Sequence, residues 1–203
     1  MKIFSYKTIK SPAEGSYKEK GSKFLAFAFP VQSEEEIKQK LAELRKKYFD
    51  ARHHCYAFTL GADKNRFRAA DDGEPNHSAG DPILGQIRSK ELTNVLIVVV
   101  RYFGGTKLGV GGLITAYKTA AEEALNNAMV IECEVMRAIK LQYDFSASAE
   151  VMKLVKEFDV KIISQEFGEG ASLNGEVHLK NMEAFGQKVQ LLKALGNPIH
   201  LIE

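Results

Sequence analysis

The 203-residue sequence has no tryptophan, two cysteines, five prolines and no long hydrophobic run. The cysteines, Cys55 and Cys133, are too few for a disulfide framework, so we expect a reduced, cytoplasmic protein. The longest apolar run, residues 95–100, is too short to cross a bilayer, and residues 1–15 lack the apolar stretch of a signal peptide. These absences argue against a secreted or membrane-bound protein.

The sequence also lacks a large excess of either charge. Its 28 lysines and arginines against 26 acidic residues leave a net charge of +2, which excludes a polybasic nucleic-acid-binding tail. A local basic groove is still compatible with this balance, because steering depends on the local field. With 45% hydrophobic residues, the chain is long enough to form one or two domains without metal or disulfide support.

Hydrophobic periodicity in the first two thirds of the chain indicates alternating strands and helices. A capping box, Ser33 with Glu36, opens a helix whose apolar stripe is Ile37, Leu41, Leu44 and Tyr48. Polar residues with glycine and proline predict a long loop over 63–82. The other expected elements are strands over 24–29, 53–61 and 93–103 and helices over 83–90 and 113–128.

The pattern changes at a seam near residues 132–136. Residues 137–203 then read as strand, helix, strand, strand, helix, strand, which is the order of a ferredoxin-like split βαβ unit. We therefore predict an α/β (α+β) protein with two domains, residues 1–134 and 135–203, the first an α/β layer domain and the second ferredoxin-like.

A glycine-rich loop lies inside the segment VVVRYFGGTKLGVGGLITAY, residues 98–117. Glycine lets other atoms approach the backbone, and free amides at a helix start favour an anion. The pattern is neither a Walker A loop nor a dinucleotide fingerprint, and a tight strand-to-helix crossing remains an equal alternative. The candidate anion-binding residues are Arg101, Gly104, Gly105, Lys107, Gly109, Gly111 and Gly112, together with Ser78.

A second cluster, ADDGEPNHSAGDP, places three carboxylates within four positions. Asp71, Asp72 and Glu74 are candidates for acid–base chemistry or for a hard cation, or they cap their own backbone in a solvated loop. The spacing matches no defined calcium or zinc loop, and His53 and Cys55 with a distant His77 lack a fourth zinc ligand. We therefore expect no metal and no cofactor.

Taken together, KGSKFLA, DARHHCYAF, DDGEP followed by AGDPIL, and VVVRYFGGTKLGVGGLITAYKTAAEEAL resemble the YigZ/IMPACT family over residues 15–128. The resemblance implies a first domain like the second domain of a small-subunit ribosomal protein. It implies a second domain like the C-terminal ferredoxin-like domains of the ribosomal translocase elongation factor. In the eukaryotic branch, IMPACT acts in translational control. One departure is His77, which stands where the family commonly has glycine.

Three hypotheses follow, and chain order allows the 52–54, 71–80 and 101–112 segments to converge on one edge of a sheet as a shared site. The leading hypothesis is a translation-linked regulator that binds RNA, the ribosome or another anionic ligand through the glycine loop. The second is a hydrolase acting on a phosphorylated or peptide-like substrate, with catalytic candidates His53, His54, Asp71, Asp72 and Glu74. The third is a regulatory module that binds a protein through the C-terminal domain. The sequence leaves the oligomeric state open.

Overall fold

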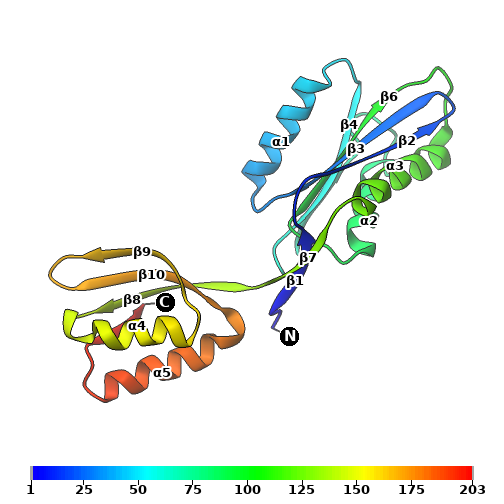
Figure 1. Cartoon of the computed structure of the whole chain (residues 1–203). Helices are drawn as coiled ribbons and strands as arrows, with labels where there is room; N and C mark the ends of the chain where they lie inside the picture. Colours follow the sequence, from blue (N-terminus) through cyan, green and yellow to red (C-terminus); the bar gives the residue numbers. More distant parts are fainter. Residues whose placement is uncertain (1, 203) are drawn as a thin grey trace. The chain divides into compact units, whose positions relative to one another are not determined.

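A computed structural model describes residues 2–202, which form two compact units with separate hydrophobic cores (Figure 1). One unit comprises residues 6–133, and the other comprises residues 134–202 with residues 2–5. The protein is a mixed α/β protein, as the sequence predicts. Among residues 2–202, no helix combines the length and apolar character needed to cross a membrane.

The N-terminal unit is built on a five-stranded antiparallel sheet in the order β2-β3-β6-β4-β5. Helix α1 covers one face, and helices α2 and α3 cover the other. The strands are β2 (Ala13–Glu19), β3 (Ser22–Pro30), β4 (His53–Leu60), β5 (Arg66–Ala70) and β6 (Val95–Tyr102), and the helices are α1 (Glu34–Lys47), α2 (Gly80–Ser89) and α3 (Gly109–Asn126).

Both faces of this sheet are buried because both faces of its central strands are apolar. In β3, Phe24 and Ala26 enter the core beneath α2 and α3, while Phe27 enters the core beneath α1. The first turn of α1 confirms the predicted cap, since the Ser33 hydroxyl accepts a hydrogen bond from the Glu36 amide at 3.2 Å. The two-sided burial explains why β6 reads as a continuous apolar run.

Three features of the N-terminal unit were not predicted. Strand β5 lies inside the segment expected to be a loop, and β2 forms a hairpin with β3 around Lys20 and Gly21. A separate two-stranded sheet pairs β1 (Ser5–Ile9) with β7 (Val130–Glu134). β2 is only half-buried, and it gains its support from α3, because Gly15 packs directly on the backbone of Ala124.

The C-terminal unit has the element order β8-α4-β9-β10-α5-β11, and its sheet order is β11-β8-β10-β9. Both helices pack against one face of the sheet, where Leu141, Leu173 and Phe185 are fully buried. This is the ferredoxin-like order that the sequence suggests. Its elements are β8 (Met136–Tyr143), α4 (Ser148–Glu157), β9 (Lys161–Phe167), β10 (Ala171–His178), α5 (Met182–Ala194) and β11 (Ile199–Ile202).

Candidate functional site

The predicted site residues meet where β4 begins and β6 ends. His53 lies opposite Arg101 in the β4–β6 register, and the acidic loop, defined as residues 71–80, folds against the start of β4. The glycine loop, defined as residues 104–112, continues directly from β6 into α3. Chain topology therefore brings the two loops to the same end of one sheet.

The Asp71 carboxylate links the acidic loop to the start of α2. It accepts hydrogen bonds from the amides of His77, Ala79 and Gly80 at 2.9–3.0 Å. Desolvation acts to raise the pKa of Asp71, but these three amides and the nearby His77 outweigh it and hold that pKa below its ordinary value. The carboxylate is an N-terminal helix cap in its ionised form.

Asp72 joins the same loop to β4 and α1. One carboxylate oxygen accepts from the His54 amide at 2.7 Å, and the other pairs with Arg45 at 3.1 Å. The backbone of Asp72 has a positive φ of 41°, which a residue with a short polar side chain tolerates. Asp72 thus fixes the entry of β4.

Glu74 forms the buried centre of the site. Its Oε1 accepts from Arg101 Nη1 at 2.6 Å and from the Tyr117 hydroxyl at 2.8 Å, and the two ion-pair side chains are 5% and 7% exposed. The Cys55 thiol donates to the Asp71 carbonyl and lies 3.3 Å from the Tyr117 hydroxyl. Burial raises the pKa of both Cys55 and Tyr117, so both stay protonated at neutral pH.

The two adjacent histidines have different surroundings. His53 is half-buried, and its Nδ1 lies 2.9 Å from the Asp72 carbonyl oxygen, which orients the ring. His54 points to the α1 face, is buried, and its Nε2 has no hydrogen-bond partner among residues 2–202. Burial lowers the pKa of His54 and keeps it neutral.

Two predicted anion ligands are corrected by this geometry. Arg101 is buried and paired with Glu74 rather than free to clamp an external anion. The Ser78 hydroxyl is also buried and donates to the Pro75 carbonyl at 2.6 Å. His77 adopts a positive φ of 64°. The acidic loop thus satisfies its polar groups internally, and residues 2–202 contain no metal-binding cluster of three or more His, Cys, Asp or Glu side chains.

The glycine loop divides into a packed part and an open part. Gly104 is packed: a Cβ there would lie 1.9 Å from the Gly21 carbonyl carbon, and its amide donates to the Ser22 hydroxyl. This contact ties the loop to the tip of the β2–β3 hairpin. At Gly112 a Cβ would meet the Leu108 side chain at 3.0 Å.

Gly105, Gly109 and Gly111 form the open part. A Cβ at any of these three positions would have nothing within 4 Å, and all three residues are exposed. Among residues 2–202, no side chain caps the first turn of α3, which begins at Gly109. The backbone amides of that turn therefore face solvent at the positive end of the helix dipole.

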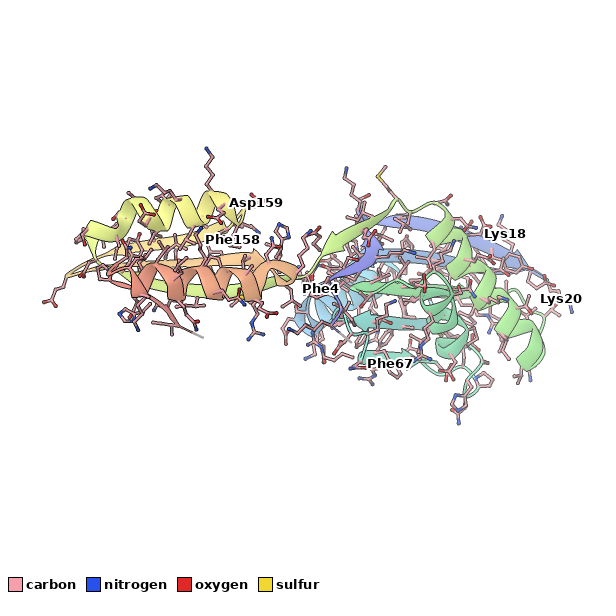
Figure 2. The ribbon with its side chains drawn as sticks, turned by 90° about the horizontal axis from the view of Figure 1, so that it is seen from below. Phe4, Lys18, Lys20, Phe67, Phe158 and Asp159 are labelled. Atoms are coloured by element: carbon pink, nitrogen blue, oxygen red, sulfur yellow. The ribbon has the colours of Figure 1, made fainter. Side chains whose placement is uncertain are left out.

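Four exposed lysines lie in the β2–β3 hairpin and the glycine loop, but only Lys20 and Lys107 lie at the open part, and sequence reasoning identified only Lys107. Lys20, at the tip of the hairpin that contacts Gly104, lines a small cavity together with Leu108 and Gly112, and Figure 2 shows its position. Lys18 and Lys23 lie on the face of the sheet opposite α3, because their neighbours Tyr17 and Phe24 face α3. Within the described chain, none of the four ammonium groups lies within ion-pair distance of a carboxylate. The spacing KEKGSK does signal a lysine-rich hairpin, but only the contact of Gly21 with Gly104 brings it to the loop.

An aromatic ring and a small cavity complete this region. Phe103 is 57% exposed, and the Arg101 guanidinium lies 5.7 Å from its ring centroid. A cavity of about 200 Å³ opens between the hairpin and α3. It is lined in part by Lys20 and Gly112, and also by Glu19, whose carboxylate accepts from the Tyr17 hydroxyl. We call Lys20, Phe103, Lys107 and the open part of the loop the glycine-loop surface.

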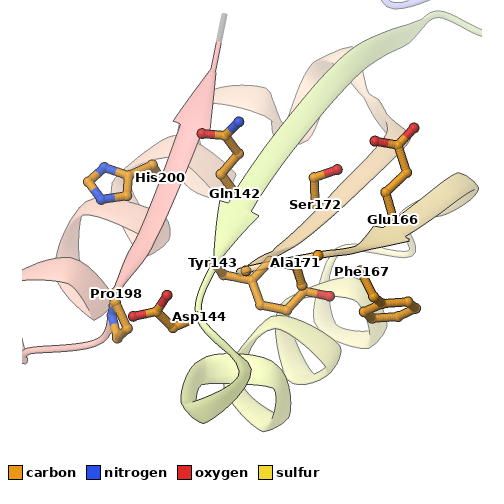
Figure 3. A pocket seen from close by; sticks show the side chains of 11 residues that line it. Gln142, Tyr143, Asp144, Glu166, Phe167, Ala171, Ser172, Pro198 and His200 are labelled. Atoms are coloured by element: carbon orange, nitrogen blue, oxygen red, sulfur yellow. The ribbon is translucent and has the colours of Figure 1, made fainter.

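The C-terminal unit has a separate cavity of about 610 Å³ (Figure 3). It lies at the end of the β9–β10 hairpin next to β11, and its lining includes Glu166, Phe167 and His200. No sequence feature predicted this cavity, because its lining residues come from four separate strands, β8 to β11, and their connecting loops.

Comparisons with known proteins agree with the motifs. The model of the Impact N-terminal domain family matches residues 20–125. IMPACT family member YvyE of Bacillus subtilis (strain 168) is 31% identical over 91% of this chain and 85% of its own length. IMPACT family member YigZ of Escherichia coli (strain K12) is 33% identical over 73% of this chain and 74% of its own length.

A solved structure has a similar fold over the full length of the chain. The crystal structure of a protein described as hypothetical matches 100% of this chain and 99% of its own, with a TM-score of 0.78 and 28% sequence identity. The family-model match, the similar relatives and the motif geometry agree. The chain belongs to the IMPACT family.

Proposed function

We propose that this protein is a translation-linked binding protein that takes RNA, or another phosphate-bearing polyanion, at the glycine-loop surface. The observation that carries the proposal is the open part of the loop, where the uncapped start of α3 lies beside Lys20 and Lys107, neither of which has a carboxylate partner among residues 2–202. A helix N-terminus and ammonium groups both favour phosphate.

The exposed ring of Phe103 favours RNA over a simple anion. It lies at the end of β6, next to the glycine loop, and a base can stack on its free face. Stacking on one aromatic side chain tolerates any base, so the expected binding has little sequence preference. The translational link rests on the resemblance of both domains to translation-machinery folds.

The hydrolase alternative has less support. Asp71 and Asp72 accept backbone and arginine hydrogen bonds, and Glu74 is buried against Arg101 and Tyr117. Groups held in this way are not free to activate water or to hold a cation. The protein-docking alternative is supported by the 610 Å³ cavity of the C-terminal unit. Full-chain Glu166→Ala and His200→Ala variants would test it through loss of a captured partner.

The proposal is tested by measuring the affinity of the full chain for single-stranded oligouridylate across a salt series. We expect binding at low salt that weakens steeply as salt rises, because each phosphate contact releases counterions. The double variant Lys20→Gln/Lys107→Gln should bind about tenfold more weakly, and its log–log salt slope should be smaller by about 1.4.

A matched control uses Lys156→Gln/Lys193→Gln, which removes the same charge from exposed helix positions of the C-terminal unit. This control should keep the wild-type affinity and slope. No binding of the wild type at low salt, or equal losses in the two double variants, would overturn the proposal.

A further inference from the structure

Strand β5 has the sequence RFRAA and forms one edge of the N-terminal sheet. We propose that this edge docks an extended acidic segment of a partner protein, which adds to the sheet as a further strand. The proposed partner segment alternates acidic and apolar residues. This inference is independent of the glycine-loop surface, since β5 and β2 are opposite edges of the sheet.

The backbone of β5 is available on one side over Arg66 to Arg68, while Gly80 at the start of α2 packs on the backbone of Ala69 and Ala70. Strand β5 pairs with β4 from Arg66 to Ala70, and no other strand among residues 2–202 pairs with it. An unpaired edge presents a row of N–H and C=O groups that an added strand can satisfy. Backbone pairing of this kind needs an extended peptide, which a nucleic acid cannot imitate.

The side chains of β5 define the chemistry of the partner. Arg66 and Arg68 lie on the same face, opposite Leu60 and Phe58 of β4, and both are exposed. Neither guanidinium has a carboxylate partner in the described part of the chain. An added strand with acidic residues at alternate positions would place a carboxylate beside each arginine.

The opposite face of β5 offers an apolar contact. Phe67 is 51% exposed (Figure 2), and the guanidinium of Arg88 on α2 lies 4.5 Å from its ring centroid. The residue between the two acidic positions of the added strand would face this ring. An apolar residue there completes an acidic–apolar–acidic pattern that fits both faces of the edge.

Charged residues on an edge strand can also serve only to prevent self-pairing. That protective role needs charge but not a particular sign. Reversing both arginines to glutamate preserves protection and removes attraction for an acidic segment, so the two roles separate experimentally.

The test uses fluorescence anisotropy of the full chain with a short labelled peptide that alternates glutamate and valine. We expect the wild type to bind it at low salt, and we expect Arg66→Glu/Arg68→Glu to bind it at least about tenfold more weakly. The reversed variant should instead bind a peptide that alternates lysine and valine. N-methylation of alternate peptide amides should abolish wild-type binding, because it removes the backbone hydrogen bonds while leaving the charge.

Arg137→Glu/Lys193→Glu, at two exposed positions of the C-terminal unit, changes the charge by the same amount; it is the matched control and should not change peptide affinity. If the reversed variant unfolds, Arg66→Gln/Arg68→Gln replaces it, and it should still lose the acidic peptide. The proposal is overturned if the wild type does not bind the acidic peptide, if binding survives N-methylation, or if oligouridylate rather than the peptide requires these arginines.

Discussion

The acidic loop and the glycine loop lie at the same end of one sheet, but the polar groups of the first are hydrogen-bonded within the protein and those of the open part of the second are exposed to solvent. In the acidic loop, Asp71, Asp72 and Glu74 each accept hydrogen bonds from the protein itself. In the glycine loop, the amides around Gly109 and Gly111 and the Lys107 ammonium face solvent. The carboxylates of the acidic loop are therefore less available to a ligand than the backbone amides and the Lys107 ammonium of the glycine loop.

This difference separates structural from functional roles. A buried polar group that satisfies its neighbours stabilises the fold and has little left for a ligand. An exposed turn of uncapped amides beside unpaired lysines adds little to stability, but it can bind an anion. Substitutions in the first loop should therefore change folding, and substitutions in the second should change binding.

The largest expected effect comes from Glu74→Gln. The substitution leaves the Arg101 charge buried without its counterion, which should lower the free energy of unfolding by about 3–5 kcal/mol. Urea denaturation measures this loss, and the folded fraction should keep its oligouridylate affinity. A variant that kept its stability but lost RNA binding would contradict the structural role of the acidic loop, because Glu74 would then contribute to ligand binding.

Next in size is the contrast between two glycines of the same loop. Gly104→Ala forces a methyl group against the Gly21 backbone and should cost about 2–3 kcal/mol. Gly111→Ala has open space around it, lies in α3, and should raise stability by about 0.5–1 kcal/mol. Thermal unfolding of both variants gives the comparison, and equal destabilisation would show that the loop is not divided into packed and open parts.

The sequence predicts most of this fold from strong local signals. Ser33 and Glu36 mark the start of α1, and the two-sided apolar pattern marks β3 and β6. It misses β5 because Arg66 and Arg68 are exposed edge residues inside a polar segment. Polarity there reflects position at the edge rather than an irregular backbone.

The sequence predicts which segments form the site, but it does not predict which side chains contact one another there. The motifs identified both loops, but the pairing of Arg101 with Glu74 depends on two elements far apart in sequence. The same holds for Lys20, which lies near the glycine loop only because Gly21 of the hairpin contacts Gly104. Such long-range contacts leave no periodic trace in a single sequence.

A smaller effect is expected from Asp71→Asn. Loss of the charged helix cap should reduce stability by about 1–2 kcal/mol at neutral pH. Because the folded pKa of Asp71 lies below its ordinary value of 3.8, its contribution is present above about pH 4 and disappears as the pH falls through the folded pKa. Denaturation curves at several acidic pH values should therefore converge for the variant and the wild type. A difference that persisted at the lowest pH would contradict the role of the ionised cap.

The smallest effect concerns His54. Its folded pKa lies below the ordinary 6.5, chiefly through burial, so its contribution is complete above that value and decreases as the pH falls below it. Replacing His54 with Gln should flatten the pH dependence of stability just below pH 6.5. The exposed His200, replaced in the same way, serves as the control. An unchanged profile for the His54 variant would show that the ring is solvated.

The central claim is that an anion binds the open part of the glycine loop. It is tested most directly by a two-dimensional NMR titration of the full chain with oligouridylate, following the backbone amides of Gly105, Gly109 and Gly111. We expect these amides to show saturable shifts while the amides of Ala79 and Gly80, bound to Asp71, stay unchanged. Shifts confined to the acidic loop or to the C-terminal unit, with the three glycines unmoved, would contradict the account.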